Sequence, residues 1–201
     1  INSPKMKRYN SIFILIILFF FLTPFSGITQ KESTKDRYVG EFFGGGIIYY
    51  LYLDSIGDQH GLIASLSDLG EYPLWGFPDY QVPNCNSSWD GASNTRAFIA
   101  AGGKSYFAIG LCATFENEGF EDWYMPSIDE FNLLFNARFV VNKVLEEDGD
   151  PSTNGILQRY YWSSSQQTAS HAWYFNAGAG FADDGSKNNL PKPHVRAIRS
   201  F

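Results

Sequence analysis

Two segments without hydrophobic periodicity, residues 66–92 and 177–190, hold the side chains whose chemistry best suits ligand binding. Tryptophan rings can stack on the face of a sugar, and carboxylate and amide groups can bond its hydroxyls. Segments this long without regular structure are usually functional or disordered. The candidate ligand-binding residues are Trp75, Trp89, Asp183, Asp184 and Asn188.

The tryptophans divide by their setting in the sequence. Trp123, Trp162 and Trp173 lie in expected strands, so we assign them to the core. Trp75 and Trp89 lie in a long loop, and two interpretations stay open for them. They either contact a ligand or pin their loop to the core.

One segment follows the first half of a calcium-binding loop. Asp150, Ser152 and Asn154 place oxygen atoms at alternate positions, and Gly155 takes the sixth. The twelfth position is Tyr161, where such a loop needs a bidentate glutamate. The sequence therefore predicts no bound metal or cofactor, and calcium is the metal whose ligand pattern it matches in part.

Sequence motifs for hydrolysis are absent. The chain holds neither the H-E-x-x-H pair of zinc proteases nor the G-x-S-x-G turn of serine hydrolases. His60, His171 and His194 are far apart in the sequence, and each fits a turn or a strand edge better than a catalytic base. We therefore expect a protein that is not an enzyme.

Cys85 and Cys112 are the two cysteines of the sequence. If the protein is exported, it folds in an oxidising compartment, where two cysteines most simply form one disulfide. Helical spacing also turns Cys112 toward an apolar face, which favours a structural bridge over a reactive thiolate. The sequence therefore predicts a disulfide between these two residues.

The N-terminal residues have the order typical of a secretory signal peptide. Basic residues come first, an apolar run from Ile12 to Leu22 follows, and small and polar residues close the segment. The apolar run is shorter than the roughly 20 residues that span a bilayer, so we expect cleavage. Residues 1–29 are assigned to this signal, with an upstream extension before Met6, and residues 30–38 to a disordered lead-in.

Residues 39–201 are then predicted to form a single acidic domain. The chain has 15 Lys and Arg against 21 Asp and Glu, and three of the basic residues fall within the signal. Such an acidic protein is not expected to bind nucleic acid or an anionic membrane. We expect a secreted or cell-surface protein with no stable membrane span after signal cleavage.

The stretch Asp122–Phe135 organises the expected elements. Pro126 ends a short aromatic strand, and Ser127 with Glu130 forms a capping box. A helix with one apolar face is therefore predicted from Ile128. Shorter helices are expected at 93–101 and 106–115, and strands at 47–53, 61–65, 160–164, 172–176 and 195–201.

Two arginines of the last expected strand need partners. Arg196 and Arg199 lie three positions apart, so their side chains point to opposite faces. At least one faces the interior, where an unpaired guanidinium would be very costly. The predicted partner is a carboxylate near the start of the central helix, namely Asp122, Asp129 or Glu130.

Eight short motifs occur in an order that resembles a known bacterial family. The motifs are Gly45–Tyr49, His60–Ala64, Trp75–Gly76, Asn94–Thr95, Asp122–Ser127, Tyr161–Ser164, Ala172–Tyr174 and Val195–Phe201. Together they resemble the extracellular domain at the C-terminus of a collagen-like adhesin, a family otherwise described as a domain of unknown function. The resemblance spans nearly the whole chain after the signal. It implies a C-type-lectin-like superfold, in which the terminal strands pair and long loops display ligand sites.

Three departures limit what this resemblance implies. The chain has no collagen-like Gly-X-Y segment, and its negative charge argues against binding sulfated glycans by general electrostatics. It also lacks the Glu-Pro-Asn, Gln-Pro-Asp and Trp-Asn-Asp signatures with which animal C-type lectins hold calcium and sugar. The resemblance therefore implies binding but leaves its chemistry open.

The sequence thus predicts an α+β protein of C-type-lectin-like type, with short antiparallel sheets, two or three helices and long ordered loops. We expect a secreted or surface binding module whose partner is an extracellular glycan or a surface protein. Two alternatives stay open. One is an oxidase related to formylglycine-generating enzymes, which would use a cysteine pair, and the other is a purely structural component of a surface assembly.

Overall fold

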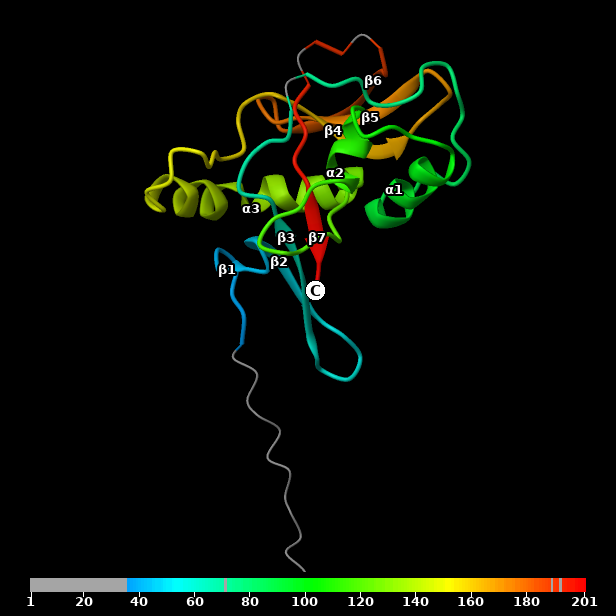
Figure 1. Cartoon of the computed structure of the whole chain (residues 1–201). Helices are drawn as coiled ribbons and strands as arrows, with labels where there is room; N and C mark the ends of the chain where they lie inside the picture. The colour runs from blue at the N-terminus through cyan, green and yellow to red at the C-terminus, as the bar shows by residue number, and fades with distance from the viewer. Residues whose placement is uncertain (1–35, 71, 189, 192) are drawn as a thin grey trace, which may run out of the picture. The chain divides into compact units, whose positions relative to one another are not determined.

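The computed structural model describes residues 36–70, 72–188, 190–191 and 193–201. The predicted signal peptide and most of the lead-in, residues 1–35, lie outside the described residues. The described chain forms three helices and two antiparallel sheets (Figure 1). The α+β class and the expected number of helices are therefore confirmed.

The first sheet joins the N-terminal strands to the C-terminal strand. It contains β1 (Phe42–Phe43), β2 (Gly46–Leu53), β3 (Gln59–Ala64) and β7 (Ile198–Ser200), in the order β1-β2-β3-β7. The aromatic and β-branched run of β2 pairs antiparallel with β3, so the two strands expected at 47–53 and 61–65 form a hairpin. The pairing of Ile63 with Arg199 ties the end of the chain to this hairpin.

The second sheet contains β4 (Tyr160–Gln166), β5 (His171–Asn176) and β6 (Phe181–Ser186). The sequence predicts a loop over 177–190, and this prediction is wrong for β6. Its Gly and Asp residues have low intrinsic β propensity, but every residue of β6 pairs with one of β5. Pairing with a buried neighbouring strand therefore outweighs the local preference.

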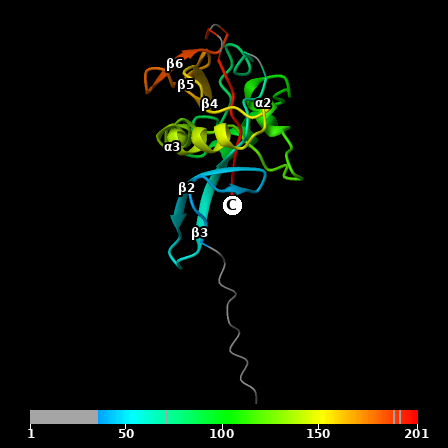
Figure 2. The same ribbon diagram turned by 90° about the vertical axis from the view of Figure 1, so that its left-hand side faces the viewer.

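The three helices are α1 (Gly91–Ala100), α2 (Ala108–Ala113) and α3 (Ile128–Glu147). The predicted capping box is present at the start of α3, where Glu130 Oε2 accepts a hydrogen bond of 2.8 Å from Ser127 N. Figures 1 and 2 show α3 between the two sheets, and it contacts β2 on one side and β4 and β5 on the other. Among the described residues, no helix is both long and apolar enough to cross a membrane.

Two apolar clusters form the core. One brings the loop that contains Trp75 against Phe98 of α1 and against α2. The other surrounds α3 and includes Phe131 and Tyr161, whose rings stack at 4.9 Å. Trp123 and Trp162 are buried as predicted, and Trp173 is half-buried.

Both arginines of the C-terminal segment are buried, but they have different partners. Arg199 makes the predicted type of contact, because its Nε and Nη2 donate to the two oxygens of Asp122 at 2.7 and 2.8 Å. Arg196 pairs instead with Asp68, whose position in the long loop 66–92 gives no signal of this contact. The other two predicted partners bind elsewhere: Asp129 accepts from Ser88, and Glu130 accepts from backbone groups and from Tyr124.

Candidate functional site

A surface hollow of about 510 Å³ lies where the chain enters β4, and we call it the tyrosine pocket. One wall comes from the loop 66–92, another from the segment that leads into β4, and a third from the end of β5. Its lining residues are Tyr72, Gln158, Arg159, Tyr160, Asn176 and Pro191. The long loop predicted to carry function therefore contributes to this hollow, although through a residue that the sequence does not single out.

The tyrosine pocket combines aromatic rings with hydrogen-bonding groups. Tyr72 is half exposed, and Tyr160 is held edge-on against Tyr174 with ring centroids 5.4 Å apart. Asn176 accepts a hydrogen bond from Ala179 N through Oδ1, so its amide nitrogen is the group that can donate to a ligand. Among the described residues that line the pocket there is no carboxylate, and the one formally charged side chain is the guanidinium of Arg159.

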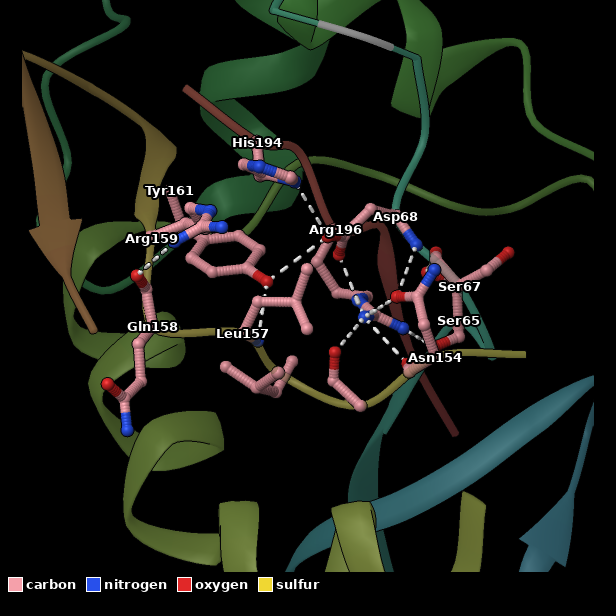
Figure 3. A network of polar contacts seen from close by, with 12 residues as sticks. Ser65, Ser67, Asp68, Asn154, Leu157, Gln158, Arg159, Tyr161, His194 and Arg196 are labelled. Atoms are coloured by element: carbon pink, nitrogen blue, oxygen red, sulfur yellow. Dashed lines mark hydrogen bonds and ion pairs between the residues drawn. The ribbon is translucent and has the colours of Figure 1, made fainter. Parts of the chain in front are cut away.

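A buried network of charged groups lies beneath this pocket (Figure 3). Asp68 Oδ2 lies 2.9 Å from His194 Nδ1 and accepts a 3.1 Å hydrogen bond from the hydroxyl of Tyr161. Asp68 Oδ1 lies 2.8 Å from Arg196 Nη2, close enough for an ion pair but without the alignment of a hydrogen bond. The guanidinium is fully buried, so the carboxylate is the charge that makes its burial tolerable.

The network also fixes the wall of the pocket. Arg196 Nη2 donates to Asn154 Oδ1 at 2.8 Å and to Gly155 O at 3.1 Å. The hydroxyl oxygen of Tyr161 accepts from Leu157 N at 2.9 Å. Burial and the neighbouring Asp68 carboxylate raise the pKa of Tyr161, so its proton stays in place to donate. Residues 154–157, which precede Gln158, are therefore held in place by hydrogen bonds to the buried network.

Tyr72 connects the network to the pocket. Its ring packs edge-on against the imidazole of His194, with centroids 5.8 Å apart. The imidazole also packs against the ring of Tyr161. A backbone φ of +49° at Tyr72 is uncommon for a non-glycine residue, and such conformations persist where the surroundings hold them. The aromatic face is thus supported from its buried side.

The structure does not bring the sequence-predicted ligand residues into one site. Trp75 is fully buried, and its Nε1 donates to Ser163 O at 2.7 Å, so it pins its loop to the core. Trp89 is 72% exposed in the turn before α1. Asp183 and Asp184 lie in β6, a different element of the fold. The ligand prediction for Trp75 is therefore wrong, and the one for Trp89 stays a prediction.

The acidic candidates lie on a different element from the one expected. Asp183 and Asp184 are exposed residues of β6, and Asn188 is exposed just beyond that strand. Asp183 Oδ2 accepts a hydrogen bond from the hydroxyl of Tyr174 at 3.4 Å. All three remain accessible to a ligand, but none of them lines the tyrosine pocket.

The half-matched calcium loop does not converge on one point. Asp150 Oδ1 accepts from the backbone nitrogen and the hydroxyl of Ser152, which makes a local turn. These hydrogen bonds lower the pKa of Asp150. Asn154 Oδ1 is turned instead toward Arg196, a cation that already uses this oxygen. Across the part of the chain that the structure describes, no group of three or more His, Cys, Asp and Glu residues could hold a metal.

The predicted disulfide is absent, and this prediction is wrong. Cys85 and Cys112 are both free and buried. The thiol of Cys85 donates to the carbonyls of Asn94 and Ser164, and Cys112 packs in the apolar cluster beside α1. Burial raises the pKa of the Cys85 thiol to about 12 and also raises that of Cys112. Counting two cysteines in an exported chain cannot show whether their side chains face each other.

The fold is similar to that of one solved surface protein. A fimbrial protein from Bacteroides ovatus matches with a TM-score of 0.50 and 15% sequence identity over 76% of this chain. This chain spans 43% of that protein's length, less than half. At this identity the likeness shows the fold, and it does not extend to the adhesin family or the C-type-lectin-like type that the sequence motifs resemble. No protein-family model and no curated protein matches the chain.

Proposed function

We propose that this protein is an exported, non-catalytic binding module of C-type-lectin-like type, and that its ligand is a glycan held in the tyrosine pocket. The observation that carries the proposal is the lining of that pocket. Two tyrosine rings offer faces on which a sugar can stack, and the Arg159 guanidinium with two amides offers donors for its hydroxyl oxygens.

The form of the pocket also suits binding. Its volume of about 510 Å³ lies within the range of small-ligand sites, and the Asp68 network holds one wall in place. A wall that is already ordered lowers the entropy cost of binding. Export follows from the signal-like N-terminus and agrees with a fold that a fimbrial protein shares.

The oxidase alternative fits the cysteines poorly. Catalysis by a cysteine pair needs an accessible thiolate, and thiolates form where the pKa is lowered. Both thiols are buried here, and the pKa of Cys85 is raised to about 12. The chemistry of these two residues is that of small apolar core side chains.

A structural role in a surface assembly is the second candidate function. The likeness to a fimbrial protein favours it, since that protein is named for its place in such an assembly. An assembly subunit would bind copies of itself or other surface proteins, and no glycan. The two functions therefore separate in one binding experiment.

The experiment is a glycan array probed with residues 30–201, with and without calcium. Tyr72→Ala and Arg159→Ala should abolish the array signal, while the melting temperature stays within about 2 °C because both side chains reach the surface. Trp89→Ala is the matched control, since it removes an exposed aromatic ring outside the pocket. We expect the control to bind as the wild type does, and calcium to change nothing.

Two results would contradict the proposal. An array on which the wild type binds no glycan would favour the assembly subunit. Loss of binding in Trp89→Ala, with the pocket variants unaffected, would place the site beside α1 instead.

A further inference from the structure

A second hollow, which we call the α3 groove, adjoins the tyrosine pocket. It has a volume of about 590 Å³ and lies between the C-terminal half of α3, residues 156–158 and the turn 177–180 between β5 and β6. Gln158 lines both hollows, and Asn176 of the pocket is followed directly by Ala177 of the groove. Figure 3 shows Gln158 next to Arg159 on the segment that both hollows share.

The α3 groove presents its own aromatic and donor groups. Phe139 is 79% exposed, which is unusual for a phenylalanine on the surface of a helix. The guanidinium of Arg138 lies 3.8 Å above the ring of Phe135 and donates through Nη1 to Phe135 O at 2.8 Å. This stacking holds a flat cation in place at the groove, with other N–H groups available for a ligand.

The walls of the groove are ordered by hydrogen bonds. The side chain of Asn142 donates to Ile156 O at 3.1 Å and accepts from Ile156 N at 2.6 Å, which joins α3 to the segment before β4. A Cβ atom at Gly155 would come within 2.6 Å of Asn142 Oδ1, so glycine is what allows this close approach. On the opposite side, Gly178, Ala179 and Gly180 form a turn with small side chains that leaves the groove open.

We infer that the ligand is a linear polysaccharide bound along its length, with one part in the tyrosine pocket and the next in the α3 groove. This inference rests on the proposed function and adds a second subsite to it. A module that recognises a terminal sugar needs one closed pocket. Here two hollows, each within the size range of a small-ligand site, share Gln158 as a lining residue and each contain aromatic and guanidinium groups.

Two joined subsites predict a strong dependence on ligand length. Once one sugar of the polysaccharide occupies the tyrosine pocket, the neighbouring sugars of the same polysaccharide are present at the α3 groove at a high effective concentration. An oligosaccharide too short to reach the groove loses this gain. We therefore expect binding to strengthen by at least about 10-fold between a disaccharide and a hexasaccharide of the same sugar, and by about 100-fold if both subsites are fully engaged.

The test uses immobilised ladders of two to eight sugars prepared from cellulose, xylan, mannan, chitin and polygalacturonate. The wild type should bind at least one ladder, with the hexasaccharide far above the disaccharide. Phe139→Ala should lower hexasaccharide binding to the disaccharide level and leave disaccharide binding unchanged. Asn136→Ala is the control, since it is exposed on the same helix but does not line the groove.

The outcomes separate this inference from the proposed function. Equal binding of disaccharide and hexasaccharide, or unchanged hexasaccharide binding by Phe139→Ala, would overturn the second subsite and leave the tyrosine pocket standing. Absence of wild-type binding to every ladder and to the wider array would overturn the glycan proposal itself, and the extended site with it.

Discussion

Arg196 and Arg199 show how two identical side chains in one short segment take different energetic roles. Arg196 is fully buried against Asp68, whose side chain is only 8% exposed. Arg199 meets Asp122, whose side chain is 58% exposed, and also stacks its guanidinium on Phe120 at 4.1 Å. Water can therefore solvate the partner of Arg199 but hardly reaches the partner of Arg196.

This difference predicts unequal losses of stability. Arg196→Met leaves a buried carboxylate without its cation and should lower the free energy of unfolding by about 3–5 kcal/mol. Arg199→Met leaves an exposed carboxylate and should cost about 1–2 kcal/mol. Urea denaturation of both variants measures the difference. Adding Asp68→Asn to the Arg196 variant should recover part of the loss, and equal losses in the two single variants would contradict the argument.

The residue scale also shows what the sequence can and cannot reveal about pairing. The need for a buried partner follows from the arginines themselves. Asp122 lies two positions before Tyr124, whose backbone pairs with Ile198 of β7 in an isolated bridge. Asp68 lies in a loop without periodicity, so no spacing points to it. The same limit applies to Tyr72 and Arg159, whose shared pocket depends on how the loop 66–92 crosses the entry to β4.

At the scale of elements, α3 is the best predicted part of the chain because its signals are local. Ser127 and Glu130 are three positions apart, and the apolar residues that follow repeat with the helical period. Strand β6 is the opposite case, since its sequence is polar and glycine-containing and its pairing with β5 decides its structure. Local patterns therefore predict elements that are stabilised locally, and they miss those that depend on a neighbour.

The carboxylate of Glu130 caps the start of α3 and also joins α3 to α1. Its Oε2 accepts from Ser127 N and Gly91 N at 2.8 and 3.0 Å, and its Oε1 accepts from the hydroxyl of Tyr124 at 3.0 Å. Glu130→Ala would leave these buried donors without an acceptor. We expect it to lower the free energy of unfolding by about 3 kcal/mol, measured by urea denaturation.

Glu130→Gln is the matched control, because it keeps an acceptor oxygen and should lose less. Burial is the main cause that raises the pKa of Glu130, so the folded state binds its proton more tightly than the unfolded state does. The Glu130 carboxyl therefore stabilises the folded state most at pH values below the ordinary glutamate pKa. This stabilisation falls as the pH rises through the raised pKa that Glu130 has in the folded state. Glutamine does not titrate, so Glu130→Gln should remove this dependence of the free energy of unfolding on pH. An unchanged slope, or an alanine variant as stable as the wild type, would contradict this role.

At the scale of the molecule, the described chain places its two candidate subsites on the side of α3 and β5 and its exposed tryptophan elsewhere. The tyrosine pocket and the α3 groove meet at Gln158, whereas Trp89 lies in the turn before α1. The described residues that line the pocket include Arg159 and no Asp or Glu, on a chain that has 21 acidic residues against 15 basic ones.

The central claim is that a glycan occupies the tyrosine pocket, and the most direct measurement is amide chemical-shift mapping. The isotope-labelled domain would be titrated with the oligosaccharide that gives the strongest array signal. We predict that the largest shifts fall at Tyr72, Arg159, Tyr160 and Asn176, and that they extend to Ala177–Gly180 with longer chains. Shifts centred instead on Trp89, or on Asp183 and Asp184, with the pocket unmoved, would contradict the claim.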